Sequence, residues 1–416
     1  METLVVRGGR PLCGAISIHG AKNGVLPLLA ATLLSNEPCT VSGCPEITDA
    51  DCAAEILSCL GCKVCRRGEL LCVDAAASKY TCIPPELSGK MRGSVIFLGA
   101  LLARHGCAEL SMPGGCVLGA RPIDYHIRAL ETLGVKAETQ GSVLRFSWPE
   151  RHGGEVVLPF PSVGATENLM LAATGVPEPV VIRGAAREPE IAELGRFLRD
   201  MGAELSGEGG DIVTLCGGKP LHGAKRRALP DRIETATYLA LTAACGGEIT
   251  LRHTDPTLLL PVLDVLERAG CTLKISDDSI RLRSEGRLRG VRHVRADAYP
   301  GFPTDAQAPV TAALLRAEGI SEIEDTVFPC RFRHVPELRK FGADVHASGA
   351  CAVIRGVTAL HPAAAFSTDL RGGAGVLIAA LSAKGESRIE NAKLLSRGYA
   401  ALDTYLQKLG AEVFPA

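Results

Sequence analysis

The side chain with the strongest indication of reactivity lies in a loop rich in glycine and proline, residues 111–122. The loop reads Ser-Met-Pro-Gly-Gly-Cys-Val-Leu-Gly-Ala-Arg-Pro and places Cys116 shortly before Arg121. A thiol in an electropositive loop ionises more easily, which suits a nucleophile or a general acid–base group. A single loop cysteine in a chain with 16 cysteines is more often incidental. The role of Cys116 therefore depends on the groups that accompany it.

Basic residues recur where helices are expected to begin. They are Lys22, Arg92 and Arg371 before one class of helix, and Arg121, Arg187, Arg331 and Arg397 before another. Helix N-termini carry free N–H groups and the positive end of the helix dipole, so these positions together favour an anion. Capping or surface ion pairing explains any single arginine, but it explains the recurring placement less well. Asp305 stands at a similar helix start, where its alternative role is an N-cap.

The elements that must position these residues repeat along the whole chain. A helix-ending glycine recurs at nearly equal intervals, at Gly61, Gly134, Gly202, Gly270, Gly342 and Gly410. Glycine suits a helix C-cap, where the backbone turns left-handed before a strand. The spacing predicts six units of nearly equal length.

Each unit has the same predicted order of elements. An apolar helix comes first, over 25–34, 94–103, 167–173, 234–243, 307–315 and 373–382. A strand such as 248–251, an amphipathic helix such as 190–201, the glycine, and two strands such as 272–275 and 279–282 follow. One βαβαββ unit cannot bury all its faces, whereas three packed together can, so the pattern predicts an α/β protein of two three-unit domains. A linear solenoid is the alternative packing.

Composition excludes several classes of protein. The 416 residues are 46% hydrophobic and 22% charged with a net charge of −1, which argues against a disordered chain and against a nucleic-acid or membrane-surface protein. The longest apolar stretch, 25–34, is shorter than the roughly 20 residues that span a bilayer. With no export signal visible, we expect a cytoplasmic protein. The absence of a Walker loop, a dinucleotide fingerprint and an H-E-x-x-H motif predicts no cofactor and no metal.

One cysteine cluster resembles a metal-binding run. Cys59, Cys62, Cys65 and Cys72 read C-x2-C-x2-C-x6-C, a spacing superficially like an iron–sulfur or zinc site. The turn at Leu60-Gly61 predicts instead that Cys62 and Cys65 lie on opposite faces of a strand. The sequence favours plain thiols packed in the core, with a metalloprotein as the alternative.

Taken together, the motifs resemble those of the UDP-N-acetylglucosamine 1-carboxyvinyltransferase family. The match extends in order over essentially the whole chain. It rests on Lys22-Asn23, 113–116, 119–122, 186–190, 229–235, 302–307, 334–338, 368–371 and 397–399. The resemblance implies a two-domain inside-out α/β barrel of six βαβαββ repeats, with a first domain at 22–229 and a second at 1–21 plus 230–416. It also implies an active site in the cleft between them.

The resemblance further implies a reaction. The family transfers the enolpyruvyl group of phosphoenolpyruvate to the 3′-hydroxyl of UDP-N-acetylglucosamine and releases phosphate, the first committed step of peptidoglycan precursor synthesis. By position, Cys116 is the thiol that acts on phosphoenolpyruvate and Asp305 is the base for the sugar hydroxyl. Lys22, Arg121 and Arg397 match phosphate and carboxylate binders. No cofactor is implied.

Further positions match substrate-binding segments of that family. Asn23 and Asp305 hold the amino sugar, and Arg92, Arg331 and Arg371 complete a cationic pocket. Asp369 matches a further substrate-binding position. The nucleotide-binding segments correspond to Arg121, Pro122, Ile123, Asp124, Tyr125, Ser162, Val163, Gly164 and Val327. The chain departs from the family pattern at Phe160-Pro161, where a lysine-containing pair often precedes Ser162, and at Pro329-Cys330.

Two other functions compete with this interpretation. The shikimate-pathway enolpyruvyl transferase shares the implied architecture but lacks a loop of the Cys116 type and has a Ser-rich segment where this chain has Ala21-Lys22-Asn23. A non-catalytic or regulatory paralogue would keep UDP-sugar binding and lose turnover. The presence of both Cys116 and Asp305 argues for the enzyme.

Overall fold

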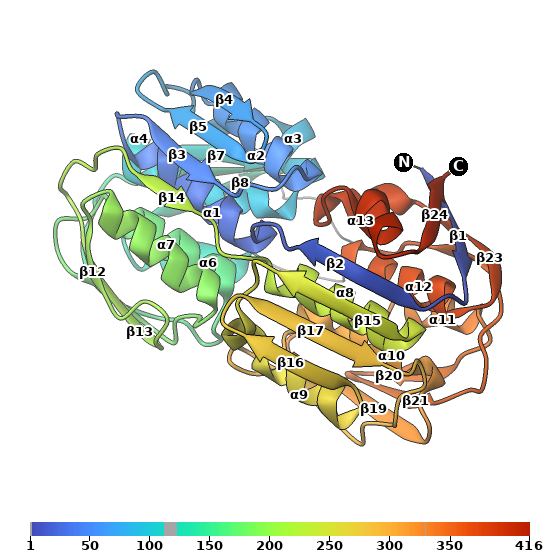
Figure 1. The fold of residues 1–416 in the computed structure, drawn as a ribbon. Coiled ribbons are helices and arrows are strands. Elements are labelled where there is room, and N and C mark those ends of the chain that lie inside the picture. Colours follow the sequence, from blue (N-terminus) through green and yellow to red (C-terminus); the bar gives the residue numbers. More distant parts are fainter. Residues whose placement is uncertain (1, 112–122, 329) are drawn as a thin grey trace. The chain divides into compact units, whose positions relative to one another are not determined.

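The computed structural model describes residues 2–111, 123–328 and 330–416 (Figure 1). The chain divides into two compact units. One contains the residues up to His19 together with Pro230–Ala416, and the other contains the described residues from Gly20 to Leu229. Each unit is treated below by itself.

The Gly20–Leu229 unit alternates helices with short strands. Its helices are α1 (Lys22–Ala31), η1 (Thr32–Leu34), α2 (Thr48–Cys59), α3 (Pro85–Lys90), η2 (Arg92–Ile96), α4 (Phe97–His105), α5 (Asp124–Glu131), α6 (Val163–Ala173) and α7 (Pro189–Asp200). Its strands are β3 (Cys39–Ser42), β4 (Lys63–Arg67), β5 (Leu70–Asp74), β6 (Cys82–Ile83), β7 (Cys107–Ser111), β8 (Lys136–Gln140), β9 (Val143–Ser147), β10 (Gly154–Val157), β11 (Val180–Arg183), β12 (Glu204–Ser206), β13 (Ile212–Cys216) and β14 (Lys225–Arg227).

The unit with both termini follows the same plan. Its helices are α8 (Arg232–Cys245), η3 (Pro256–Leu259), α9 (Leu260–Arg268), η4 (Thr304–Ala306), α10 (Gln307–Ala313), η5 (Leu314–Arg316), α11 (Val335–Arg339), α12 (Leu370–Ser382), η6 (Ala392–Arg397) and α13 (Leu402–Lys408). Its strands are β1 (Thr3–Gly8), β2 (Leu12–Ser17), β15 (Gly247–Arg252), β16 (Thr272–Ser276), β17 (Ser279–Ser284), β18 (Val294–Ala296), β19 (Ile320–Asp325), β20 (Asp344–Ser348), β21 (Cys351–Arg355), β22 (Ala364–Phe366), β23 (Gly385–Glu390) and β24 (Glu412–Pro415).

The described strands form six four-stranded sheets, one for each predicted repeat. In most of them a parallel pair is extended by an antiparallel hairpin, as in β10-β11-β13-β12 and β18-β19-β21-β20. The predicted strand 248–251 is β15, and the strands predicted at 272–275 and 279–282 are β16 and β17. The prediction of an α/β fold built from six βαβαββ repeats is confirmed.

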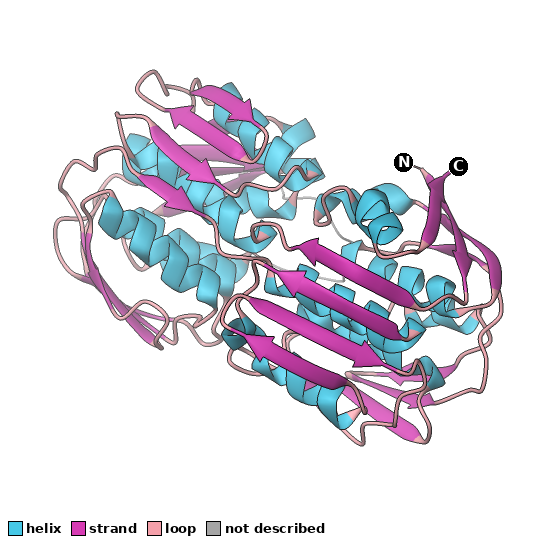
Figure 2. Ribbon diagram, viewed as in Figure 1, coloured by secondary structure: helices cyan, strands magenta, loops and turns pink. Residues whose placement is uncertain are grey.

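Helices occupy the centre of each unit and sheets surround them, which makes the architecture inside-out (Figure 2). In the unit with the termini, α8, α10 and α12 pack on one another, and all the residues of α10 and α12 are buried. A helix that is apolar on every side is stable only in such a position. The predicted first helices of the repeats are these central helices together with α1, α4 and α6.

The six predicted glycines lie just beyond the ends of α2, α5, α7, α9, α11 and α13. Their φ angles fall between +82° and +100°. Side chains with a Cβ rarely adopt this left-handed conformation, so glycine is the residue that lets each amphipathic helix turn directly into a strand. The predicted helix C-caps are confirmed.

Strands from distant parts of the chain complete several sheets. Strand β2 pairs in parallel with β15, and β14 pairs in parallel with β3. Strand β1 lies between β23 and β24, with Leu4 opposite Ile389 and Pro415, so the two termini lie side by side (Figure 1). The first strand of the chain therefore belongs to the sheet of the last repeat. No helix among the described residues is long and apolar enough to span a membrane.

Candidate active site

The predicted site residues divide between the two units. The Gly20–Leu229 unit carries Lys22, Asn23, Arg92, Ile123, Asp124, Tyr125, Ser162, Val163 and Gly164. The unit with the termini carries Asp305, Val327, Arg331, Asp369, Arg371 and Arg397. Cys116, Arg121 and Pro122 lie outside the described residues, as does Pro329.

Lys22 is the first residue of α1, and its position is fixed by a carboxylate. The Lys22 Nζ lies 2.9 Å from Oδ2 of Asp49 in the first turn of α2, and only 14% and 4% of the two side chains are exposed. An ammonium group held this way is preorganised, because little side-chain freedom remains to be lost when a second anion arrives. Asn23 follows in the same first turn of α1. The pairing of Lys22 with Asp49 has no local signal in the sequence, since the two residues begin different helices.

The predicted nucleotide segments open two neighbouring helices, α5 and α6, which pack together. Asp124 is the first residue of α5, and its buried Oδ1 has no hydrogen-bond partner among the described residues. Ser162 caps α6 by accepting a hydrogen bond from the Ala165 N–H at 3.4 Å. Arg92 begins η2 in the same unit, and burial lowers the pKa of its guanidinium. The structure thus gathers several of the predicted binding groups at helix starts.

In the other unit, a carboxylate lies between two arginines. Arg331 Nη2 lies 2.6 Å from Asp305 Oδ1, and Arg371 donates to Asp305 Oδ2 from Nη2 at 3.1 Å and from Nε at 3.3 Å. The arginine side chains are 6% and 2% exposed, whereas that of Asp305 is 22% exposed. Asp305 therefore keeps a solvent-facing edge while both of its oxygens are held. Pro303, not Asp305, occupies the N-cap position of η4.

The residues that support this group carry no local sequence signal. Arg331 Nη1 donates to Thr304 Oγ1 at 3.0 Å, and Thr304 donates to Asp325 Oδ2 at 2.6 Å. The other oxygen of Asp325 accepts the backbone N–H groups of Val327 and Phe328. The predicted binding position Val327 is therefore anchored to the same network as Asp305. These links join separate segments of the chain, which no local motif reveals.

Asp369 has a structural role at the start of α12. Its Oδ1 accepts the backbone N–H groups of Arg371 and Gly372, each at 3.0 Å, which makes it the N-cap of that helix. The Arg371 guanidinium lies 5.4 Å from the ring centre of Tyr399, whose hydroxyl is 2.9 Å from Thr237 Oγ1. These contacts hold Arg371 within α12, where it is fully buried.

Arg397 ends η6, so the structure places it before α13 as the repeat pattern predicts. His334 lies in the same unit and is fully buried. Neither ring nitrogen has a hydrogen-bond partner among the described residues, and burial together with the charge of Arg331 lowers the pKa of His334 to about 4, despite Asp369 nearby. The sequence motif at 334–338 contained this histidine, but nothing in it indicated a neutral imidazole.

The arrangement suits chemistry on an anionic substrate. Buried or half-buried cations can hold phosphate and carboxylate groups, and a fixed carboxylate such as Asp305 can take a proton from a hydroxyl. Among the described residues, no three His, Cys, Asp or Glu side chains gather closely enough to hold a metal ion. In the early cysteine cluster Cys62 is buried, but Cys59 and Cys65 are exposed, so the prediction of core thiols is wrong for these two. Cys65 lies on β4 opposite Cys72 of β5.

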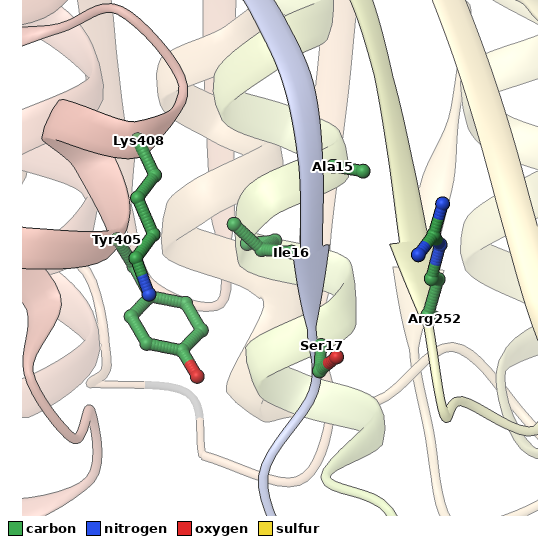
Figure 3. A pocket seen from close by; sticks show the side chains of 6 residues that line it. All are labelled: Ala15, Ile16, Ser17, Arg252, Tyr405 and Lys408. Atoms are coloured by element: carbon green, nitrogen blue, oxygen red, sulfur yellow. The ribbon is translucent and has the colours of Figure 1, made fainter.

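A separate small pocket of about 170 Å³ lies in the unit with the termini (Figure 3). Ala15, Ile16 and Ser17 of β2 form its floor, flanked by Arg252 of β15. Tyr405 and Lys408 of α13 form the opposite wall. None of the predicted site residues lines it, so it is not part of the candidate site.

Comparison with known proteins places this geometry in a family. The family model for EPSP synthase (3-phosphoshikimate 1-carboxyvinyltransferase) matches residues 6–406. A UDP-N-acetylglucosamine 1-carboxyvinyltransferase 2 from Caldanaerobacter subterraneus subsp. tengcongensis is 41% identical over 99% of both chains. A UDP-N-acetylglucosamine 1-carboxyvinyltransferase from Idiomarina loihiensis is also 41% identical, again over 99% of both chains.

Solved structures agree with the observed fold. The enolpyruvyl transferase NikO from Streptomyces tendae superposes with a TM-score of 0.90 at 25% identity, covering 99% of this chain and 98% of the other. An EPSP synthase from Acinetobacter baumannii has a TM-score of 0.72 at 17% identity over the full length of both chains, a likeness of fold. The chain therefore belongs to the enolpyruvyl transferase family that the EPSP synthase model describes, and within it to the UDP-N-acetylglucosamine 1-carboxyvinyltransferases.

Proposed function

We propose that this enzyme transfers the enolpyruvyl group of phosphoenolpyruvate to the 3′-hydroxyl of UDP-N-acetylglucosamine and releases phosphate. The observation that carries the proposal is the 41% identity, over 99% of both chains, to proteins named for this activity. The anion-binding character of the helix starts supports it, because phosphoenolpyruvate and the UDP-sugar are both highly charged. The product would enter peptidoglycan precursor synthesis in the cytoplasm, with a role in cell-wall growth and division.

The roles proposed for individual residues follow from their chemistry. Asp305 accepts the proton of the sugar 3′-hydroxyl as its oxygen adds to C2 of phosphoenolpyruvate, while Cys116 supplies a proton to C3. Loss of phosphate from C2 and of a proton from C3 of the resulting tetrahedral ketal re-forms the double bond and leaves the enolpyruvyl ether of the sugar. Lys22, Arg121 and Arg397 neutralise the phosphate and carboxylate of phosphoenolpyruvate during both steps. No cofactor takes part in this scheme.

The geometry of the described residues supports these assignments. The two arginines that hold Asp305 keep both of its oxygens oriented, and orientation of a general base comes before its pKa in determining whether it can act. The ion pair with Asp49 orients the Lys22 ammonium in a similar way. Arg92, Arg331 and Arg371 add to the positive potential that both substrates require.

Phosphate release from phosphoenolpyruvate tests the function directly. We expect release that depends on UDP-N-acetylglucosamine, with none when shikimate 3-phosphate or no acceptor is supplied. Release with shikimate 3-phosphate would assign the chain to the other enolpyruvyl transferase reaction. Binding of the UDP-sugar by calorimetry without any release would identify a non-catalytic paralogue.

The thiol role has its own test. The Cys116→Ala variant should lose turnover, and fosfomycin, an alkylating mimic of phosphoenolpyruvate, should inactivate the wild type but add no mass to the variant. The matched control is Cys107→Ala, because Cys107 is an exposed thiol that is not among the proposed site residues. Normal turnover by Cys116→Ala would remove Cys116 from the mechanism.

A further inference from the structure

The cysteine run at 59–72 has no part in the mechanism above, and the fold pairs two of its members. Cys65 of β4 lies directly opposite Cys72 of β5 in an antiparallel hairpin (Figure 1). Among the described strand pairs, this is the one place where two cysteines stand opposite each other. Opposite residues share one face of a sheet, so the two side chains are neighbours.

The pair lies on the solvent side of its sheet. Leu71 and Val73, the neighbours of Cys72 on β5, are 0% and 1% exposed and face the core, so Cys72 points the other way. Strand β4 is the edge strand in the order β14-β3-β5-β4, and Cys65 is exposed on it while Cys72 is half-buried. A small oxidant in solution can therefore reach Cys65 without any opening of the fold.

Two sets of contacts hold the register that pairs the cysteines. A slip by one residue would bring the buried Leu71 and Val73 to the solvent face, which opposes it. On β4, Arg66 Nη1 donates to Asp51 Oδ1 at 2.7 Å, and Nη2 donates to the Pro45 carbonyl oxygen at 2.6 Å. The two thiols are therefore kept opposite each other in the native fold.

The spacing of such a pair fits an intramolecular disulfide. Opposite residues of antiparallel strands have Cα atoms about 4.5–5.5 Å apart, within the range of about 4.4–6.8 Å that a disulfide requires. Their Cβ atoms are also about 4.5–5.5 Å apart, whereas a disulfide needs about 3.5–4.5 Å, so the strands must approach by up to about 1 Å. An edge strand can make this shift, and a disulfide that requires it is more easily reduced.

The other two cysteines of the run do not join this pair. Cys62 is buried, and burial raises the pKa of its thiol to about 11 although a hydrogen bond with Ser78 acts in the opposite direction. A thiol that stays protonated does not take part in disulfide exchange. Cys59 is the last residue of α2 and lies outside the sheet. The run thus divides into one pair of facing thiols and two single thiols.

We infer that Cys65 and Cys72 form a reversible disulfide when a low-molecular-weight disulfide of the glutathione class oxidises them. The Cys65 thiolate attacks one sulfur of oxidised glutathione, which forms a mixed disulfide and releases one reduced glutathione. Cys72 then attacks the Cys65 sulfur and releases the second. Two protein thiols are oxidised, one glutathione disulfide is reduced, and the two thiol protons end on the released glutathione. This inference goes beyond the proposed function and does not rest on it.

Peptide mapping of the folded, full-length chain tests the inference. The protein is treated with a mixture of oxidised and reduced glutathione, its remaining thiols are blocked with N-ethylmaleimide, and it is digested with trypsin. Because trypsin cuts after lysine and arginine, Cys65 leaves on residues 64–66 and Cys72 on residues 68–79. We expect mass spectrometry to find these two peptides joined, and to find them separate after treatment with dithiothreitol.

A single thiol and a trapping variant provide the controls. Cys13 is an exposed strand thiol that lies opposite Glu248, so it should carry a bound glutathione and join no other peptide. In Cys72→Ser the mixed disulfide has no second thiol to resolve it, so Cys65 should keep its glutathione. The effective concentration of a neighbouring thiol is of millimolar order. At about 0.1 mM reduced glutathione, the wild-type disulfide should therefore exceed the mixed disulfide at Cys65 at least about tenfold.

Three results would overturn the inference. Cys65 could keep its glutathione in the wild type as it does in Cys72→Ser, either thiol could be found joined to a different cysteine, or the joined peptides could form only after unfolding in urea. The wild-type mapping decides even if Cys72→Ser does not fold. It requires no turnover, so its outcome is independent of the phosphate-release test of the proposed function.

Discussion

Replacing Asp305 by Asn should destabilise the unit with the termini by a measurable amount. The change keeps the shape of the side chain and removes the negative charge between two arginines that are 6% and 2% exposed. Breaking a buried ion pair by removing one partner costs about 3–5 kcal/mol, mainly because the remaining charge stays buried. The 22% exposure of Asp305 admits some water, so we take the lower end, about 3 kcal/mol.

The assay is scanning calorimetry, supported by urea unfolding. For a domain of about 200 residues, about 3 kcal/mol corresponds to a lower Tm by about 6–12 °C. Added phosphate should raise the Tm of Asp305→Asn much more than it raises the Tm of the wild type. The reason is that an added anion can take the place of the missing carboxylate. Asp344→Asn, at an exposed aspartate of the same unit, should change Tm little.

Two outcomes would refute this reasoning. An Asp305→Asn variant as stable as the wild type would mean that the arginines are solvated or paired elsewhere. The loss of stability could also persist both when phosphate is added and when Arg371 is replaced by Met. That result would mean that charge is not the cause of the loss.

Three further changes test other parts of the structure. Asp49→Asn removes the carboxylate 2.9 Å from Lys22 Nζ, so KM for phosphoenolpyruvate should change more than KM for the UDP-sugar, as steady-state kinetics would show. His126 and His334 each have a pKa of about 4, below the ordinary 6.5, so the unfolded chain binds more protons between these values and stability falls as pH drops through the window. Over this window each histidine lowers the free energy of unfolding by about 3 kcal/mol. Urea unfolding at pH 7 and pH 4.5 would show part of this loss, and His126→Asn should make the stability depend less on pH. Gly375→Ala places a Cβ 2.9 Å from a carbonyl oxygen of α10 and should lower stability by about 1–3 kcal/mol, measured by Tm.

The fold was predictable from the sequence where its signals are local. The helix-ending glycines recur at nearly constant spacing, and each requires the same left-handed backbone, so the repeat was visible in residue types alone. The pairing of β2 with β15 and of β14 with β3 was not predictable from the sequence. The paired strands are about 200 residues apart in the sequence, so they leave no local pattern.

The candidate site shows the same division. The prediction that Lys22, Arg92 and Arg371 lie at helix starts is confirmed, since a helix N-terminus has a sequence signature. The partners that orient such residues come from other elements, as Asp49 of α2 does for Lys22 of α1. Thr304 and Asp325 were missed as the groups that support Asp305 through Arg331, because their contacts join separate segments of the chain.

The pairing of the first strands with strands from the last part of the sequence fixes the order in which the two units can fold during translation. A ribosome delivers residues 20–229 in one continuous stretch, and every strand that completes those sheets, including β14, has then emerged. Strands β1 and β2 have emerged earlier but must wait for β15, β23 and β24. At about 5–20 residues per second, β1 waits roughly 20–80 s for β24. One unit can thus fold during translation, while β2 stays unpaired until β15 is made and β1 until β23 and β24 are made. Nascent β1 therefore keeps its strand edges open longest and is the segment that we expect to need chaperone protection from aggregation.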